Sequence, residues 1–340
     1  MPKRGQQAGD DLTAIARRLV AAHPDAPART LGRRLQAESN GALTLDQAYQ
    51  RIRYALGIHG PQNRRNLVSV GGTARAPRQA GQVAAMPPSK ADPWGPHELG
   101  VTGNVGVLSD IHVPYHDETA LRAAVDQLQG DRIDALVLNG DIADFYAISR
   151  YTKDPRKRNF KAEVSATREM LAWIRSQFAS IPIVFKAGNH EERWNHWLWQ
   201  HAPEISDEKR MGLDQWLDMD DHGIEFIEDQ RPIMAGQLPI LHGHEEGKGI
   251  SAPVNPARGS FMRLHHTSLK GHCHRTSAHS EPDMFGREIV TWSTGCLCDL
   301  RPEYARFNKF NHGFASVRIQ ASGEFDVSNF RITNGTVRSS

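Results

Sequence analysis

The chain has 340 residues, three cysteines and a formal net charge of +2 at pH 7. So few cysteines exclude a disulfide framework and favour a reducing compartment. We find no long apolar run and no signal-peptide pattern, so we expect a cytoplasmic protein without a membrane partner.

The charge is distributed unevenly along the chain. Residues 1–90 carry 14 Lys or Arg against 5 Asp or Glu, which gives +9, whereas the remaining residues carry 27 against 34, which gives −7. A basic N-terminal part on an acidic body predicts that the N-terminal part meets a polyanion.

Residues 10–60 are predicted to form a small helical module. Apolar spacing indicates a helix from Asp10 up to the prolines at 24 and 27, a second over 28–38 and a third over 45–56, with Thr44 as its N-cap. The module resembles a helix-turn-helix and is either a DNA-binding unit or a docking and oligomerisation module. In the DNA-binding interpretation the phosphate contacts are Arg33, Arg34, Arg51 and Arg53.

Residues 61–100 are predicted to be a flexible linker. With Gly60 included, this stretch holds 6 Gly and 6 Pro in 41 residues and has no sustained periodicity. Such a composition is typical of a linker.

The body, residues 101–335, alternates strands and helices at first. Apolar runs at 107–109, 135–139 and 183–187 are separated by helical patterns around 121–128 and 160–178, which is the βαβαβ pattern of an α/β fold with a mostly parallel sheet. From residue 224 onward we predict strands at 224–227, 233–241, 288–294, 315–319 and 325–332. These strands predict a second sheet behind the first.

Side chains of the metal-binding types follow these strands. Asp110 and His112 follow the first run, Asp141 and Asp144 the second, and Asn189 the third. Loops at the carboxyl ends of parallel strands converge on one crevice, and His242, His244, His272 and His274 come later in the chain.

Oxygen and nitrogen ligands without thiolate suit Mn²⁺, our first choice, or Fe or Zn²⁺. Two such ions can hold a bridging hydroxide and clamp a phosphoryl group. The sequence therefore predicts a dinuclear phosphoesterase centre.

The order of these motifs resembles the calcineurin-like metallophosphoesterases. The motifs are Asp110-x-His112, Gly140-Asp141-x-x-Asp144, Gly188-Asn189-His190-Glu191, His242-Gly243 and Gly271-His272-x-His274. The resemblance covers about residues 104–330 and implies a four-layer α/β/β/α sandwich. It also implies that Asp110, His112 and His274 hold one metal, that Asn189, His242 and His272 hold the other, and that Asp141 bridges them.

The resemblance further implies that His190 acts on the leaving group as general acid or electrostatic stabiliser, with Asp144 orienting its ring. His242 is preferred to His244 because the family ligand precedes the Gly, although the spacing leaves both open. Arg150 and Lys153, just beyond the site, are candidates for gripping substrate phosphates, and a solvated loop is the alternative.

Finer features resemble the branch often encoded by phages, and such an origin would place the protein in the host cytoplasm. They are Asp144-Phe145-Tyr146, Ser149-Arg150-Tyr151 and the segment 295–300. Phe145 stands where the Ser/Thr protein phosphatases of this superfamily have Arg, which disfavours protein phosphatase activity.

We therefore predict a phosphoesterase acting on nucleic acid or nucleotides. The alternatives are a small-molecule phosphatase or phosphodiesterase and a non-catalytic DNA-binding scaffold on the same fold. The oligomeric state stays open.

Overall fold

The computed structural model describes residues 4–57, 86–247 and 254–339. The chain divides into two compact units, Met1–Ala91 and Asp92–Ser340. Most of the predicted linker lies outside the described residues. Its last part belongs to the second unit, where His97–Glu98 forms strand β1.

The first unit consists of three helices, α1 (Arg4–Ala22), α2 (Ala28–Glu38) and α3 (Leu45–Ala55). Thr44 caps α3, because its hydroxyl accepts from the Gln47 N–H while the Gln47 side chain accepts from the Thr44 N–H. Gly32 lies inside α2 for a packing reason: a Cβ there would come 3.1 Å from the Tyr49 Cα. The glycine therefore lets α2 and α3 pack closely.

One of the two sheets of the second unit has seven strands, in the order β13-β12-β11-β2-β3-β4-β5. Strands β2 to β5 are parallel, and β11 pairs antiparallel with β2. The strands are β2 (Gly103–Leu108), β3 (Ala135–Asn139), β4 (Ile183–Lys186), β5 (Ile224–Ile227), β11 (His312–Ile319), β12 (Phe325–Thr333) and β13 (Thr336–Ser339).

The second sheet of this unit has six strands, in the order β1-β6-β7-β8-β10-β9. Its further strands are β6 (Ile233–Ala235), β7 (Leu238–Leu241), β8 (Ser268–Lys270), β9 (Ser277–Pro282) and β10 (Glu288–Ser293). Strands β7 and β8 are parallel, so their carboxyl ends lie at the same edge of this sheet.

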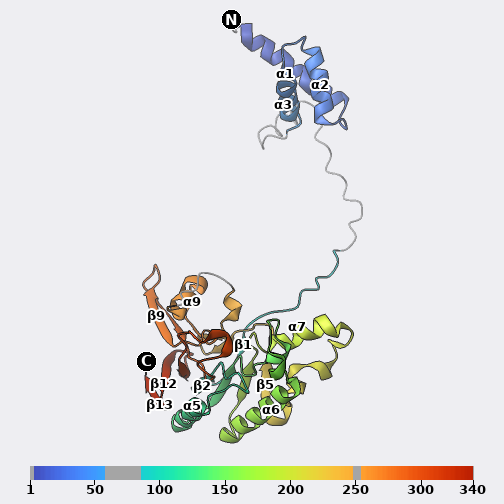
Figure 1. Ribbon diagram of the computed structural model, residues 1–340. Helices are drawn as coiled ribbons and strands as arrows, with labels where there is room; N and C mark the ends of the chain where they lie inside the picture. The colour runs from blue at the N-terminus through green and yellow to red at the C-terminus, as the bar shows by residue number, and fades with distance from the viewer. Residues whose placement is uncertain (1–3, 58–85, 248–253, 340) are drawn as a thin grey trace. The chain divides into compact units, whose positions relative to one another are not determined.

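The two sheets pack face to face between two layers of helices. Alternate side chains of β2 and β3 explain this, since Val107 and Val137 face the second sheet whereas Leu108 and Leu138 face the helices. Helices α5 (Glu118–Gly130) and α6 (Phe160–Gln177) cover the first sheet, and α9 (Pro256–Leu264) covers the second (Figure 1).

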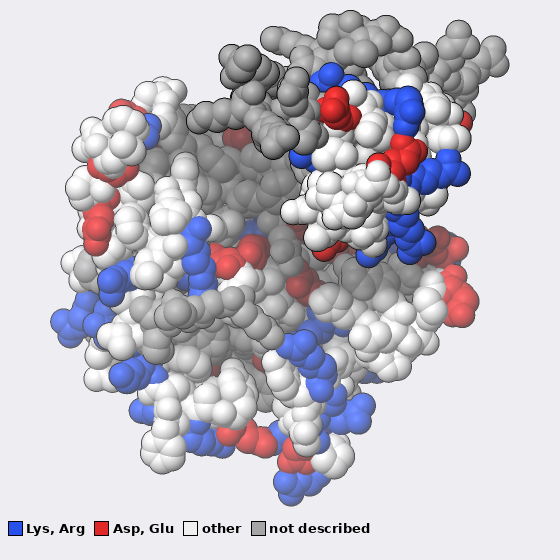
Figure 2. All heavy atoms as spheres, turned by 90° about the horizontal axis from the view of Figure 1, so that it is seen from above, with Lys and Arg blue, Asp and Glu red and all other residues white. Residues whose placement is uncertain are grey.

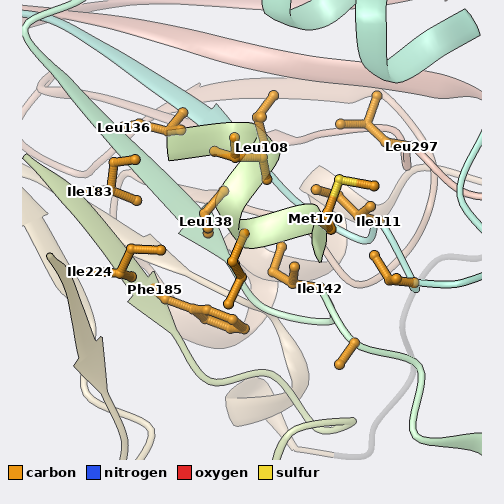
Figure 3. Close-up of a cluster of buried hydrophobic side chains, with 14 of the residues drawn as sticks. Leu108, Ile111, Leu136, Leu138, Ile142, Met170, Ile183, Phe185, Ile224 and Leu297 are labelled. Atoms are coloured by element: carbon orange, nitrogen blue, oxygen red, sulfur yellow. The ribbon is translucent and has the colours of Figure 1, made fainter. Parts of the chain in front are cut away.

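Figure 3 shows the core that forms under the helices, where leucine and isoleucine side chains from β2, β3, β4 and β5 lie together and Phe185 lies at one side of them. The predicted four-layer α/β/β/α sandwich is confirmed.

Two details of the strand prediction were wrong. Segments 224–227, 315–319 and 325–332 extend the first sheet at its two edges instead of building the second. Segment 233–241 is not one strand but the hairpin β6–β7, which turns at Gly236 with a φ of 59°. Alternation alone does not tell which neighbour a strand pairs with, and a Gly in a strand pattern was the available sign of the turn.

Candidate metal centre

Five loops meet at one edge of the sandwich. The loop after β2 carries Asp110 and His112, the loop after β3 carries Asp141 and Asp144, and the loop after β4 carries Asn189 and His190. Those after β7 and β8 carry His242, and His272 with His274. All of the residues that we predicted to bind metal therefore come to a common region of the fold.

The backbone at this edge takes an unusual conformation. Asp110, His112, Asp141, His272 and His274 all have φ between 53° and 64°. Non-glycine residues adopt this left-handed region rarely, and when they do so together at one place the surrounding structure must hold them there.

Glycines beside these residues allow close approach of the loops. A Cβ on Gly140 would lie 2.5 Å from Nδ1 of His242, and one on Gly188 would lie 2.4 Å from Oδ1 of Asp141. Neither position can carry a side chain without displacing a predicted metal ligand.

The carboxylate of Asp141 is at the centre of the cluster. Its Oδ2 lies 3.2 Å from Nε2 of His242 and 3.8 Å from Nε2 of His112, while its Oδ1 accepts a hydrogen bond of 2.9 Å from the His190 N–H. Asp141 is thus positioned between two sets of imidazoles.

Asp110 and two histidines form one side of the cluster. Oδ1 of Asp110 lies 3.1 Å from Nε2 of His274, and that nitrogen is also 3.1 Å from Nε2 of His112. His242, His272 and Asp141 form the other side, with ligand atoms within 4.8 Å of one another.

Four buried polar atoms of the cluster have no hydrogen-bond partner among the described residues, and for two of them no ion-pair contact is found either. These two are Oδ1 of Asn189 and Nδ1 of His272. An amide oxygen that is buried without a partner costs free energy unless something outside the chain binds it. The donor set and these atoms fit divalent metal ions.

Burial and pairing shift the ionisation of these groups. Burial opposes ionisation of Asp110, yet the nearby His274 lowers its pKa to about 2. Burial likewise opposes a charge on His242, yet Asp141 raises its pKa to about 10. Burial and the neighbouring His242 lower the pKa of His272 to about 4. Groups of this kind bind either protons or metal ions, so the two compete.

The structure distinguishes His242 from His244 by their contacts. The ring of His242 is fully buried, its Nδ1 donates to the Asn139 carbonyl over 2.8 Å, and its Nε2 faces Asp141. Nε2 of His244 instead lies 2.9 Å from Oε1 of Glu192. The geometry therefore favours His242 as a ligand, with His244 behind it.

Glu191 holds the loops together, although our sequence analysis gave it no role. Its buried carboxylate accepts four backbone hydrogen bonds of 2.8 to 3.0 Å, from the N–H groups of Asp141, Ile142, Ala143 and Gly188. The loop after β3 is thereby fixed to the loop after β4. The sequence contained the signal, because Glu191 belongs to the quoted Gly-Asn-His-Glu motif.

Asp144 contacts two imidazoles instead of one. Its Oδ1 lies 2.9 Å from Nδ1 of His112 and 3.3 Å from Nδ1 of His190. The prediction that Asp144 orients His190 therefore describes only part of its contacts, since it also fixes the ring of His112.

Arg193 is a second residue that sequence reasoning missed. Its guanidinium donates to Nε2 of His190 over 2.8 Å and to the backbone carbonyl of Asp144 over 2.7 Å. Nδ1 of His190 donates to the same carbonyl over 2.8 Å, so Nε2 is the accepting nitrogen here. Arg193 lies one turn after His190 in α7 (Glu192–His201), a spacing that could have revealed the contact.

Arg150 and Lys153 both interact with their own loop. The guanidinium of Arg150 lies over the ring of Tyr151, and the ammonium of Lys153 donates to the Ser149 carbonyl. Burial and the cations Arg158 and Arg193 lower the pKa of Lys153, which indicates that these three cations lie near one another.

The four arginines predicted to bind DNA differ in exposure. Arg33 and Arg34 are exposed on α2, and Arg34 contacts Nε2 of His23. Arg51 donates to the Thr13 hydroxyl, and Arg53 lies over the ring of Tyr49. Arg51 and Arg53 thus take part in packing within the helical unit.

Comparison with known proteins gives a consistent family assignment. A family described as calcineurin-like phosphoesterase matches residues 103–308. The gene 54 protein of Mycobacterium phage L5 is 26% identical over 195 residues, which cover 55% of this chain and 75% of that protein.

Solved structures that this chain is similar to include a dimetal phosphatase from Danio rerio, with 12% sequence identity and a TM-score of 0.34. The match covers 68% of this chain and 96% of that one. Vacuolar protein sorting 29 from Cryptosporidium parvum is another, at 13% identity and a TM-score of 0.38, covering 70% and 95%.

Among the described residues, no helix has the length and apolar character needed to span a membrane. The family match extends over more than half of the chain and includes every loop that carries a predicted metal ligand. The chain belongs to the calcineurin-like phosphoesterase family and is a metal-dependent hydrolase acting on phosphoester bonds.

Proposed function

We propose that the cluster binds two divalent ions and hydrolyses phosphoesters of nucleic acids or nucleotides. The observation that carries this proposal is the position of Asp141, whose Oδ2 lies between the imidazoles of His112 and His242. A carboxylate can bind two ions at once, whereas a neutral imidazole binds one.

The remaining ligands divide around Asp141. Asp110, His112 and His274 lie within contact distance of one another on one side. His242 and His272 lie on the other side, and the unpartnered Oδ1 of Asn189 supports its place with them.

Oxygen and imidazole donors suit Mn²⁺, with Fe or Zn²⁺ as alternatives. When bound, such ions supply Lewis-acid polarisation of the phosphoryl group and activation of water.

His190 and Arg193 act on the substrate in this proposal. The His190 ring is held by the Asp144 carbonyl at Nδ1, which directs Nε2 toward the side where Arg193 and Asp141 lie. A guanidinium there can bind a phosphoryl oxygen, and once it leaves Nε2 that nitrogen can take up a proton from water and donate it to the leaving group.

The substrate class rests on charge. Residues 1–90 carry a net +9, and Arg193 brings a guanidinium to His190 in the second unit. Figure 2 shows Lys and Arg interspersed with Asp and Glu on the side of each unit that is in view. Recognition of a polyanion would therefore use local groups of cations within a unit.

A panel of substrates with Mn²⁺ tests this proposal. We expect the full chain to hydrolyse bis-p-nitrophenyl phosphate and single-stranded DNA or RNA faster than phosphopeptides. Faster turnover of p-nitrophenyl phosphate than of the diester would favour the small-molecule phosphatase. If the chain binds no metal and hydrolyses no substrate with Mn²⁺, the result would favour the non-catalytic scaffold over an enzyme.

A further inference from the structure

A cavity of about 140 Å³ adjoins the candidate metal centre. His112 and Asp144 form one wall, and the others include Tyr115, Tyr146 and Tyr304. A group covalently attached to a phosphate at the metal centre would have this cavity beside it. The inference that follows rests on the proposed function.

Two of the tyrosines are fixed by their surroundings. The Tyr115 carbonyl accepts from the Asp299 N–H over 2.8 Å, and the Tyr146 hydroxyl accepts from the Asp154 N–H over 2.7 Å. Their rings meet edge to face with centroids 6.5 Å apart. The aromatic wall is therefore built before any ligand arrives.

The third tyrosine lies on the segment 299–308, where Tyr304 belongs to the short helix η7 (Glu303–Ala305). The Asn308 amide donates to the Leu300 carbonyl over 2.8 Å, and Arg301 and Arg306 donate to each other's carbonyls. The segment is thus braced by its own hydrogen bonds. Tyr304 remains 72% exposed, so its ring can be covered by a ligand.

The charges around the cavity largely cancel. Lys157 forms an ion pair with Glu303, and Arg306 faces a lining that also contains Asp144 and Asp299. Such a lining gives little attraction for a second phosphate, but it offers donors and acceptors to the edge of a neutral ring. The volume is below the roughly 300 Å³ of a pocket for a whole drug-sized ligand, so it suits one ring system.

We propose that this cavity is a subsite for the nucleobase of a nucleotidyl phosphoester whose phosphate occupies the metal centre. Aromatic side chains stack on any base, because every base has a π-face, and each stacked base contributes about 1 to 3 kcal/mol. Tyr304 supplies the exposed ring, and the fixed pair Tyr115 and Tyr146 shapes another part of the wall.

Equilibrium binding tests the subsite without requiring turnover. The full chain with Mn²⁺ is titrated with adenosine 5′-monophosphate and with ribose 5-phosphate, which differ only by the base. We expect the nucleotide to bind about tenfold more tightly, and this ratio to fall toward one in Tyr304→Ala and to persist in Tyr304→Phe. Phe285→Ala is the matched control, since Phe285 is 75% exposed but does not line the cavity, and it should keep the wild-type ratio.

A kinetic comparison separates failure of the subsite from failure of the proposed function. The substrates are the p-nitrophenyl ester of thymidine 5′-monophosphate and methyl p-nitrophenyl phosphate, and the quantity is the ratio of their kcat/KM values. We expect a ratio of about ten that is lost in Tyr304→Ala. Hydrolysis of both esters with equal kcat/KM in the wild type, or equal affinity for the two ligands above, would overturn the subsite and leave the phosphoesterase intact. Hydrolysis of neither ester with Mn²⁺ would instead contradict the proposed function.

Discussion

The metal centre and the helical unit use charged residues in opposite ways. At the centre, Asp110, Asp141 and His242 are buried, and their ligand atoms are aimed at one another from different loops. In the helical unit, Arg33 and Arg34 are exposed on one helix. Burying an ionised group is costly unless a partner or metal compensates it, whereas an exposed arginine costs little wherever it lies. A buried cluster therefore points to a function much more specifically than a basic surface does.

The largest expected effect is that of Asp141→Asn, which breaks the centre of the cluster. Turnover should fall by more than about 10⁴-fold, the upper range for loss of one positioned acid-base group, because both ions lose a ligand charge. Metal analysis should show fewer than two ions per chain. A variant with wild-type rate and metal content would contradict the role of Asp141 as a bridge.

His190→Ala should act on chemistry alone. We expect turnover to fall by about 10² to 10⁴-fold, as for a positioned acid-base group, with the metal content unchanged. Rate and metal stoichiometry are measured on the same preparation. If the ions are lost together with the rate, His190 is a ligand and its proposed role is wrong.

Much of the centre could be predicted from the sequence because ligand-type residues directly follow apolar strands. Asp110, Asp141 and Asn189 needed only the rule that parallel strands end at one edge. The contacts that Glu191 and Arg193 make with the loop after β3 could not be predicted in this way, since that loop lies about 50 residues earlier in the chain. The pairing of β5 and β11 with the first sheet depends on the same kind of long-range packing.

Glu191→Gln tests how much a buried charged group near the metal centre contributes to stability. Four backbone N–H groups now donate to the two carboxylate oxygens of Glu191, whereas a glutamine side chain has only one acceptor oxygen. Each buried donor left unpaired costs about 1 to 3 kcal/mol. We expect a loss of at least about 2 kcal/mol in the free energy of unfolding, measured by urea denaturation. Glu204→Gln, on the exposed surface, is the control and should change this free energy by less than about 0.5 kcal/mol.

The smallest expected effect concerns the helical unit. If Arg33 and Arg34 contact DNA phosphates, replacing both with glutamine should lower the log-log salt slope of DNA binding by about 1.8, at about 0.9 for each contact. The slope is measured by fluorescence anisotropy of duplex DNA between low and moderate salt. Arg122→Gln on α5 serves as a control for loss of an exposed charge. An unchanged slope would return the unit to a docking or oligomerisation role.

The number of ions bound per chain tests the central claim most directly. Equilibrium dialysis of the full chain against Mn²⁺, followed by electron paramagnetic resonance, counts the ions and reports whether they are coupled. The account predicts two Mn²⁺ per chain with a coupled signal in the wild type, and a single uncoupled Mn²⁺ in Asn189→Ala. One ion or none in the wild type, or two ions without coupling, would contradict a dinuclear centre around Asp141.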